Sequence, residues 1–219
     1  MWLGSHPFFK LFILEDLLEQ IFKKYSINTP YRKAHFLSQI DHESNGFKSF
    51  RESLNYSVEG LLKTFSRTRI SSKDCQLYGR TRTKRANQTQ IANIIYGGPF
   101  GRKNLGNIAV NDGSKFIGRG AIQLTGRLNY TKYSAASGVD FLSNPSLLET
   151  LPWALDVAGW FWSISNLNTI ADQEIITPSN LSLPTTPIYR ITKKINGGFN
   201  GLDHRYSLFV SYLKKYQNV

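Results

Sequence analysis

Two glutamates, Glu43 and Glu52, lie nine residues apart on either side of an Asn45-Gly46 break. Phe36, Ile40 and Glu43 recur at i, i+4 and i+7, which places them on one face of a helix. Burial on an apolar face raises the pKa of a carboxyl group, and this suits a general acid. Paired carboxylates perform glycoside hydrolysis, and the inverting form separates them by roughly 6.5–9.5 Å. On the pattern alone, a solvent-facing Glu43 and a chance pair of acids both remain open.

A second apolar stripe contains a cation, in a helix expected at about 202–216. Its members recur at helical spacing: Arg205, Phe209, Tyr212 and Tyr216. A guanidinium on an apolar face needs a carboxylate or carbonyl partner, because an unpaired buried charge is costly. Glu43 or Glu52 is a candidate partner of Arg205, and Asp156 is the alternative.

The elements that must position these residues are mainly α-helices. Apolar periodicity and cap residues predict helices at about 9–25, 30–44, 58–65, 129–136, 153–164, 187–195 and 202–216. The glycine-rich stretch 113–126 predicts a loop with a short hairpin, and the Pro/Ser/Thr-rich stretch 176–186 predicts a linker. No βαβ alternation is present, so the predicted class is mainly α.

The length of 219 residues fits a single catalytic domain. Its segment from Gly60 to Asn111 has ten basic residues and one acid, and is rich in Gly, Asn and Thr in its second half. We therefore expect a larger lobe at about 1–60 and 112–219 and a smaller basic lobe at about 61–111. The basic lobe is either a solvated face or a docking surface for an anionic polymer. The net charge of +12 favours a polyanionic partner.

Several classes of protein are excluded. The single Cys75 forbids an intrachain disulfide, and the scattered histidines predict no metal site and no cofactor. His42-Glu43 lacks the second histidine of a zinc-protease helix, and Gly118-Arg119-Gly120 lacks the rest of a dinucleotide fingerprint. Lys10 interrupts the apolar stretch Trp2–Leu14, so neither a signal peptide nor a membrane span is expected.

Four blocks, in order along the chain, resemble the motifs of glycoside hydrolase family 19. They are Ala34–Phe47 (AHFLSQIDHESNGF), Glu52–Ser57 (ESLNYS), Gly118–Tyr130 (GRGAIQLTGRLNY), and Ile195–Gly198 (INGG) with Asp203–Arg205 (DHR). The family contains chitinases and a bacterial and phage branch of peptidoglycan-cleaving lysins. The resemblance implies a lysozyme-like, two-lobed helical fold with a central cleft.

The resemblance also implies an inverting mechanism and a role for each matching residue. Glu43 would be the general acid, Glu52 the general base, and Thr125 would help to hold the attacking water. The positions that match substrate-binding or cleft-organising residues are Gln123, Asn129, Asn196 and Arg205, and Tyr56 and Tyr130 are expected in the cleft wall.

The charge favours peptidoglycan over chitin, because chitin is uncharged whereas peptidoglycan has peptide carboxylates. Small size, with no signal peptide and no separate wall-binding domain expected, resembles a phage endolysin for Gram-negative hosts, although a prophage enzyme or a secreted effector would look similar. Such a protein is made in the cytoplasm and reaches the cell wall, in the periplasm, after release or export by another factor. We expect a monomer that binds neither nucleic acid nor, by stable insertion, a membrane. The alternatives are a chitinase and a non-enzymatic basic binding protein.

Overall fold

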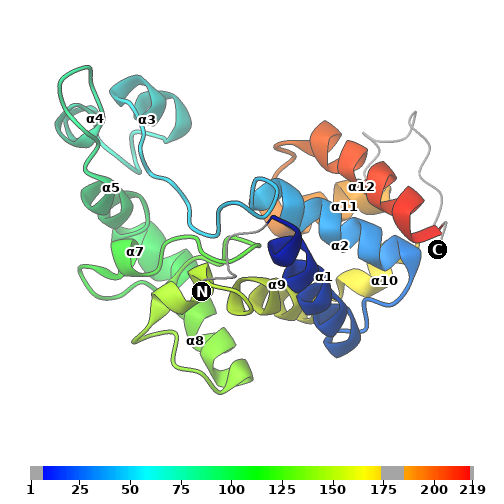
Figure 1. The fold of residues 1–219 in the computed structure, drawn as a ribbon. Coiled ribbons are helices and arrows are strands. Elements are labelled where there is room, and N and C mark those ends of the chain that lie inside the picture. The colour runs from blue at the N-terminus through cyan, green and yellow to red at the C-terminus, as the bar shows by residue number, and fades with distance from the viewer. Residues whose placement is uncertain (1–6, 174–184, 218–219) are drawn as a thin grey trace. The chain divides into compact units, whose positions relative to one another are not determined.

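The computed structural model describes residues 7–173 and 185–217, with side chains from Phe12 onward. The chain divides into two compact units (Figure 1). Unit 1 comprises Met1–Ser49, Gly120–Ile122 and Thr150–Val219, and unit 2 comprises Phe50–Arg119 and Gln123–Glu149. Unit 2 is thus larger than the basic lobe expected at 61–111, since residues on both sides of that segment pack with it.

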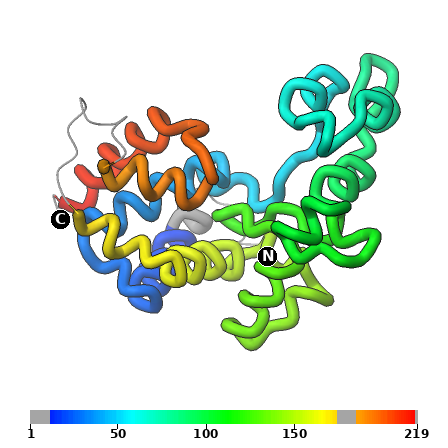
Figure 2. The backbone as a smooth tube through the Cα atoms, turned by 180° about the vertical axis from the view of Figure 1, so that it is seen from behind, coloured from blue at the N-terminus to red at the C-terminus, as the bar shows by residue number. Residues whose placement is uncertain are grey.

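Unit 1 is helical throughout its described part. Its helices are α1 (Pro7–Lys24), α2 (Pro30–Glu43), α9 (Trp153–Ile164), α10 (Leu167–Ala171), α11 (Pro187–Asn196) and α12 (Leu202–Gln217). Helix α12 packs along α2, and α9 lies beside α1 (Figure 2). Phe36 of α2 meets Trp162 of α9 edge to face, with ring centroids 5.4 Å apart. These contacts make α2 the central helix of unit 1.

Helix α2 begins and ends where its sequence dictates. The Thr29 side chain accepts a hydrogen bond from the Arg32 backbone N–H, and Pro30 takes the first helical position. After Glu43, the three residues Asn45, Gly46 and Phe47 all have positive φ, as expected for a left-handed helix end. This turn fixes Glu43 at the last helical position.

Unit 2 is built from shorter elements around its own core. They are α3 (Val58–Thr64), α4 (Ser72–Tyr78), α5 (Gln88–Ile95), α6 (Gly98–Phe100), the π-helix η1 (Gly101–Leu105), α7 (Asp112–Lys115), α8 (Arg127–Ser137) and the 3₁₀ helix η2 (Pro145–Glu149). Side-chain caps begin α3, α4 and α5 at Ser57, Ser71 and Asn87. Leu61, Cys75, Ile91 and Ile95 are fully buried in this core.

The mainly α class is confirmed, and each helix expected from the sequence is present within a few residues of its predicted bounds. In the predicted hairpin, Arg119 and Leu124 exchange backbone hydrogen bonds of 3.1 and 2.7 Å. Residues 176–184 of the predicted linker, and Trp2–His6 of the apolar N-terminal stretch, lie outside the described residues. In the described part of the chain, no helix combines the length and the apolar character that crossing a bilayer requires.

One polar side chain is sealed between α2 and α12. His35 is fully buried and stacks on Phe209, with ring centroids 4.1 Å apart. Neither ring nitrogen has a hydrogen-bond partner in the described part of the chain. Burial lowers the pKa of His35 from 6.5 to about 3. The folded state therefore holds this imidazole neutral, whereas the unfolded chain takes up a proton below pH 6.5.

Stability should consequently fall with acid between pH 6.5 and about 3. The lost free energy of unfolding should approach about 1.4 kcal/mol per pH unit from this group. Replacing His35 by Phe removes this contribution, so the difference in unfolding free energy between His35→Phe and wild type should shift in favour of the variant as the pH falls. Urea unfolding at a series of pH values measures it, and parallel curves for the two proteins would contradict the assignment.

Candidate active site

Glu43 is paired with a buried arginine. The Nη2 atom of Arg205, on α12, donates to Glu43 Oε1 at 2.5 Å. The Arg205 side chain is 0% exposed and that of Glu43 is 16% exposed. Of the partners considered for the arginine stripe, Glu43 is therefore confirmed. The alternative prediction, that Asp156 is the partner of Arg205, is wrong, because the Asp156 carboxylate accepts from Lys24 Nζ and Tyr25 Oη.

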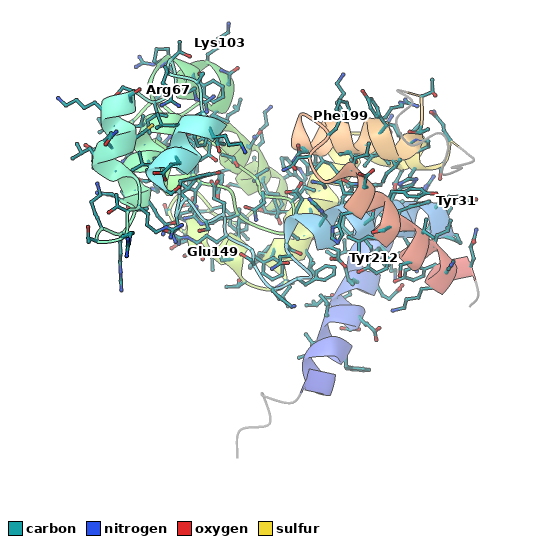
Figure 3. All side chains as sticks on the ribbon, turned by 90° about the horizontal axis from the view of Figure 1, so that it is seen from above. Tyr31, Arg67, Lys103, Glu149, Phe199 and Tyr212 are labelled. Carbon is teal, nitrogen blue, oxygen red and sulfur yellow. The ribbon has the colours of Figure 1, made fainter. Side chains whose placement is uncertain are left out.

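The remaining donors of Arg205 are also used. Its Nη1 donates to Gln39 Oε1 at 2.8 Å, and its Nε donates to the Asn200 carbonyl at 3.2 Å. Two turns further along α12, Tyr212 donates its hydroxyl to Asp41 Oδ2 at 2.5 Å, where α12 faces α2 (Figure 3). The arginine stripe thus clamps the last turn of α2, which ends in Glu43.

An imidazole lies directly before the carboxylate. His42 Nδ1 is 2.8 Å from His204 Nδ1, so one ring donates to the other. Burial, followed by the nearby Arg205 charge, lowers the pKa of His42. Its ring rests on Gly201, where a Cβ would lie 2.1 Å from His42 Cε1 and where φ is +72°. Only glycine fits both constraints, so the turn into α12 is shaped around His42.

Glu52 is held in unit 2 by two donors. The Gly118 backbone N–H donates to Glu52 Oε1 at 2.5 Å, and the Tyr96 hydroxyl donates to Oε2 at 2.8 Å. The Glu52 backbone N–H in turn donates to the Gly118 carbonyl at 3.0 Å. Both carboxylate oxygens are therefore oriented by groups in fixed positions.

Gly118 leaves room for this arrangement. A Cβ at position 118 would meet Gln123 Oε1 at 2.9 Å and the Glu52 carboxyl at 3.3 Å. The amide of Gln123 and the carboxylate of Glu52 thus converge over the same backbone atom. Gln123 has a positive φ of 55° and is half-buried. The turn at 119–124 aims this amide at the glutamate.

Thr125 and Asn129 follow directly on the same turn. Thr125 Oγ1 donates to the Gln123 carbonyl at 2.9 Å, and Asn129 Nδ2 donates to the Thr125 carbonyl at 2.9 Å. Both side chains are half-buried. Glu52, Gln123, Thr125 and Asn129 are thereby brought together within unit 2, while Glu43 and Arg205 are brought together within unit 1.

Three predicted substrate contacts take different positions. Tyr130 is 0% exposed, and its hydroxyl donates to the Ile117 carbonyl and accepts from Arg119. It therefore supports the turn and has no surface to offer a cleft wall, which corrects the prediction. Arg205 is equally buried, so it positions Glu43 and does not touch sugar. Asn196 is exposed at the end of α11 and has no hydrogen bond to Glu43 or Arg205 in the described part of the chain.

Tyr56 remains compatible with its predicted place. It is half-buried, and its ring meets Phe65 edge to face at 5.5 Å. Burial and the nearby Glu52 charge raise the pKa of Tyr56.

Within the described residues, no group of three or more His, Cys, Asp or Glu side chains is arranged to hold a metal ion.

Comparison with known proteins identifies relatives of this chain. The family model described as chitinase class I, of glycoside hydrolase family 19, matches residues 97–219. A glycosyl hydrolase family 19 domain-containing protein from Haemophilus influenzae is 32% identical over 197 residues, which cover 90% of this chain and 86% of that protein. The chain belongs to glycoside hydrolase family 19. It is therefore a glycoside hydrolase, and the family resemblance noted in the sequence is confirmed.

More distant relatives match part of their length. An endochitinase from Pisum sativum is 37% identical over 118 residues, covering 49% of this chain and 37% of that protein. The chain spans about a third of the length of such plant relatives. Chitinase C from Streptomyces griseus HUT6037 aligns over 91% of this chain and 68% of its own, at 21% identity and a TM-score of 0.48.

Sequence reasoning missed Tyr96, the residue that binds Glu52 Oε2. Burial, then the Glu52 charge, raises the pKa of Tyr96, so its hydroxyl stays protonated and donates. The preceding motif Gln88–Ile95 contains no acid and matches none of the blocks named above. A buried tyrosine within reach of a candidate base becomes visible only when α5 is folded against the 118 turn.

Tyr96→Phe removes one hydrogen bond to Glu52 and keeps the ring. A hydrogen bond to a charged group contributes enough to predict a fall in kcat of about 10- to 100-fold, with KM changed little because Tyr96 supports the carboxylate rather than sugar. Steady-state kinetics on an aminosugar oligomer measures both. Tyr78→Phe is the matched control, since Tyr78 packs against the same core and has no recorded hydroxyl partner in the described residues. Equal kcat values for Tyr96→Phe and wild type would remove Tyr96 from the site.

Proposed function

We propose that this family 19 glycosidase hydrolyses β-1,4 bonds between the aminosugars of bacterial peptidoglycan, with inversion at the anomeric carbon. Glu43 acts as general acid and Glu52 as general base, and Thr125 helps to hold the water. The inverting mechanism needs one protonated and one ionised carboxyl group. The two glutamates have different surroundings: Glu43 is paired with a guanidinium, whereas Glu52 is held by a backbone N–H and a tyrosine hydroxyl.

The acid role of Glu43 is supported by its second carboxylate oxygen, which Arg205 does not contact. The guanidinium occupies Glu43 Oε1, and Oε2 has no hydrogen-bond partner within the described part of the chain. A proton on Oε2 can therefore pass to the glycosidic oxygen of the leaving sugar. When that proton leaves, the carboxylate that forms is already paired with Arg205, which stabilises the product state of the transfer.

The base role is supported by the donors around Glu52. Two hydrogen bonds, from the Gly118 backbone N–H and the Tyr96 hydroxyl, fix the orientation of its carboxylate. Thr125 donates its own hydroxyl hydrogen to the Gln123 carbonyl, so its oxygen lone pairs can accept from a water. A water that donates one hydrogen to Thr125 and the other to Glu52 would be oriented for attack and would lose its proton to Glu52.

The observation that supports peptidoglycan is the distribution of charge. Unit 2 has 15 Lys and Arg residues against 6 Asp and Glu, so it contributes +9 of the total of +12. Chitin is neutral and gains nothing from such a field, whereas the peptide carboxylates of peptidoglycan do. An endolysin-like enzyme that meets the wall from the periplasmic side, after release or export by another factor, would use this charge. Chitin remains the alternative substrate because the plant relatives are named endochitinases.

Glu43→Gln and Glu52→Gln should each lower kcat by at least about 10²- to 10⁴-fold, the usual contribution of a general acid or base, and Thr125→Ala should cost less. Each variant should stay folded. Glu15→Gln is the matched control, because Glu15 is an exposed glutamate of α1 outside the site. Hydrolysis of a soluble aminosugar oligomer measures the series. Wild-type rates for Glu52→Gln would make the assigned base wrong.

The substrate is tested by digesting purified peptidoglycan and separating the products. We expect glycan fragments with new reducing ends, and their terminal sugar identifies the bond as that after N-acetylmuramic acid or after N-acetylglucosamine. Intact glycan strands with released peptides would refute a glycosidase acting on this polymer. Turnover of chitin oligomers with negligible release from peptidoglycan would replace the proposed substrate with chitin.

A further inference from the structure

The ten cations of the basic segment fall into two groups. Three of them have internal partners at helix ends. Arg67 donates to the carbonyls of Leu61, Leu62 and Phe65 at the end of α3, and Lys84 donates to those of Gln76 and Leu77 in α4. Arg69 donates to the Ile95 carbonyl at the end of α5. These three stabilise exposed carbonyls and helix dipoles.

The other seven are exposed, and in the described part of the chain their side chains have no recorded hydrogen bond or ion pair. They are Lys63, Lys73, Arg80, Arg82, Arg85, Arg102 and Lys103. Figure 3 labels one residue of each group, Arg67 and Lys103, both in unit 2. The helix-end role therefore explains three cations and leaves seven unexplained.

Three of the seven lie on one ordered loop between α4 and α5. The Asn87 backbone N–H donates to the Tyr78 carbonyl at 2.8 Å and closes the loop at its base. Arg80 exchanges backbone hydrogen bonds with residues 56 and 58, of 2.8 and 3.3 Å. Lys84 donates to carbonyls of α4, as described above, whereas the exposed side chains of Arg80, Arg82 and Arg85 have no recorded partner in the described residues. The loop thus presents three guanidinium groups from a fixed backbone.

A groove of about 400 Å³ opens beside this loop, lined by Ser57, Glu59, Arg80, Thr81 and Arg82. Ser57 Oγ accepts from the Gly60 N–H, which leaves its hydroxyl hydrogen without a recorded acceptor in the described residues. Thr81 Oγ1 accepts from the Thr83 and Lys84 N–H groups and lies 3.5 Å from Thr83 Oγ1. The two guanidinium groups of the lining can each bind a carboxylate, and the Ser57 hydroxyl can donate beside them.

We propose that this groove and the loop 79–87 form a docking surface for the carboxylate-bearing stem peptides of peptidoglycan. The assignment rests on the proposed function, and it adds a second contact with the same polymer. Glu59 favours this occupant, because stem peptides combine carboxylates with a free ammonium group, whereas a polyphosphate would be repelled by it. The lining contains no aromatic ring on which a nucleic-acid base could stack. Contacts repeated along a polymer raise residence on its surface even when each is weak.

The test measures binding to intact peptidoglycan sacculi in a Glu43→Gln background, so that the polymer is not degraded. The triple variant Arg80→Gln, Arg82→Gln, Arg85→Gln should bind about tenfold more weakly, since each exposed ion pair contributes modestly. On sacculi whose stem peptides have been removed, it should bind like its parent. The matched control is Lys23→Gln, Lys194→Gln, Lys214→Gln, which removes the same charge from exposed positions of unit 1. It should lose less than about twofold.

Thermal unfolding checks that both triple variants are folded, because exposed substitutions of this kind shift stability little. An unchanged affinity of the arginine variant for sacculi overturns the proposal. So does an equal loss in the lysine control, which would mean that net charge alone matters, or an equal loss on peptide-free glycan. Duplex DNA binding that exceeds sacculus binding and is lost in the arginine variant would reassign the surface to nucleic acid. The proposed function is tested separately, by the analysis of digestion products. If the protein bound sacculi with this dependence on the arginines but did not cleave them, the proposed function would be refuted and the docking surface would stand.

Discussion

Unit 1 depends on a fully buried guanidinium. Arg205 is 0% exposed, and an unpaired charge in that position would cost several kcal/mol, so the surrounding chain must supply acceptors. Glu43, Gln39 and the Asn200 carbonyl supply them. This requirement fixes the pairing of α12 with α2 and the position of the last turn of α2. The ion pair that neutralises Arg205 therefore also holds Glu43, which we propose as the acid. One interaction thus serves both the packing of α12 on α2 and the proposed chemistry.

Glu52 is positioned by a different kind of constraint. Its partners are a backbone N–H and a tyrosine hydroxyl, which are neutral, and no cation of unit 2 is recorded as bonded to it. The turn at 118–124 supplies the N–H, and the absence of a side chain at Gly118 leaves space for both the carboxylate and the Gln123 amide. One glutamate is thus bound to a charge and the other to dipoles. Each glutamate is oriented by partners within its own unit.

The sequence predicted the parts of this arrangement that are periodic. The apolar stripes of α2 and α12 are regular, so they placed Glu43 and Arg205 on facing surfaces and offered them as partners. The helices α4 and α5 were missed because they have only 7 and 8 residues, too few to repeat an apolar stripe, and α5 buries one narrow face through Ile91, Ala92 and Ile95. Tyr96 follows α5 and was missed with it. Tyr130 was placed in a cleft wall because its motif lies beside candidate site residues, but neighbours in sequence on a turn can face opposite sides of it.

The same distinction between local and tertiary information applies to the charges. Counting cations in the segment 60–111 gives a correct total and a misleading picture, since Arg67, Arg69 and Lys84 neutralise helix carbonyls within the unit. Their removal would destabilise α3, α4 and α5 whatever the polymer. The seven exposed cations do not stabilise the fold, because like charges that lack partners only repel one another in the folded state. The loop 79–87 contains cations of both groups. Lys84 bonds to carbonyls at the end of α4 and anchors the backbone, whereas three guanidinium groups face solvent. A loop that is ordered at its base and charged at its surface is suited to binding an anion without the entropic cost of ordering the loop first.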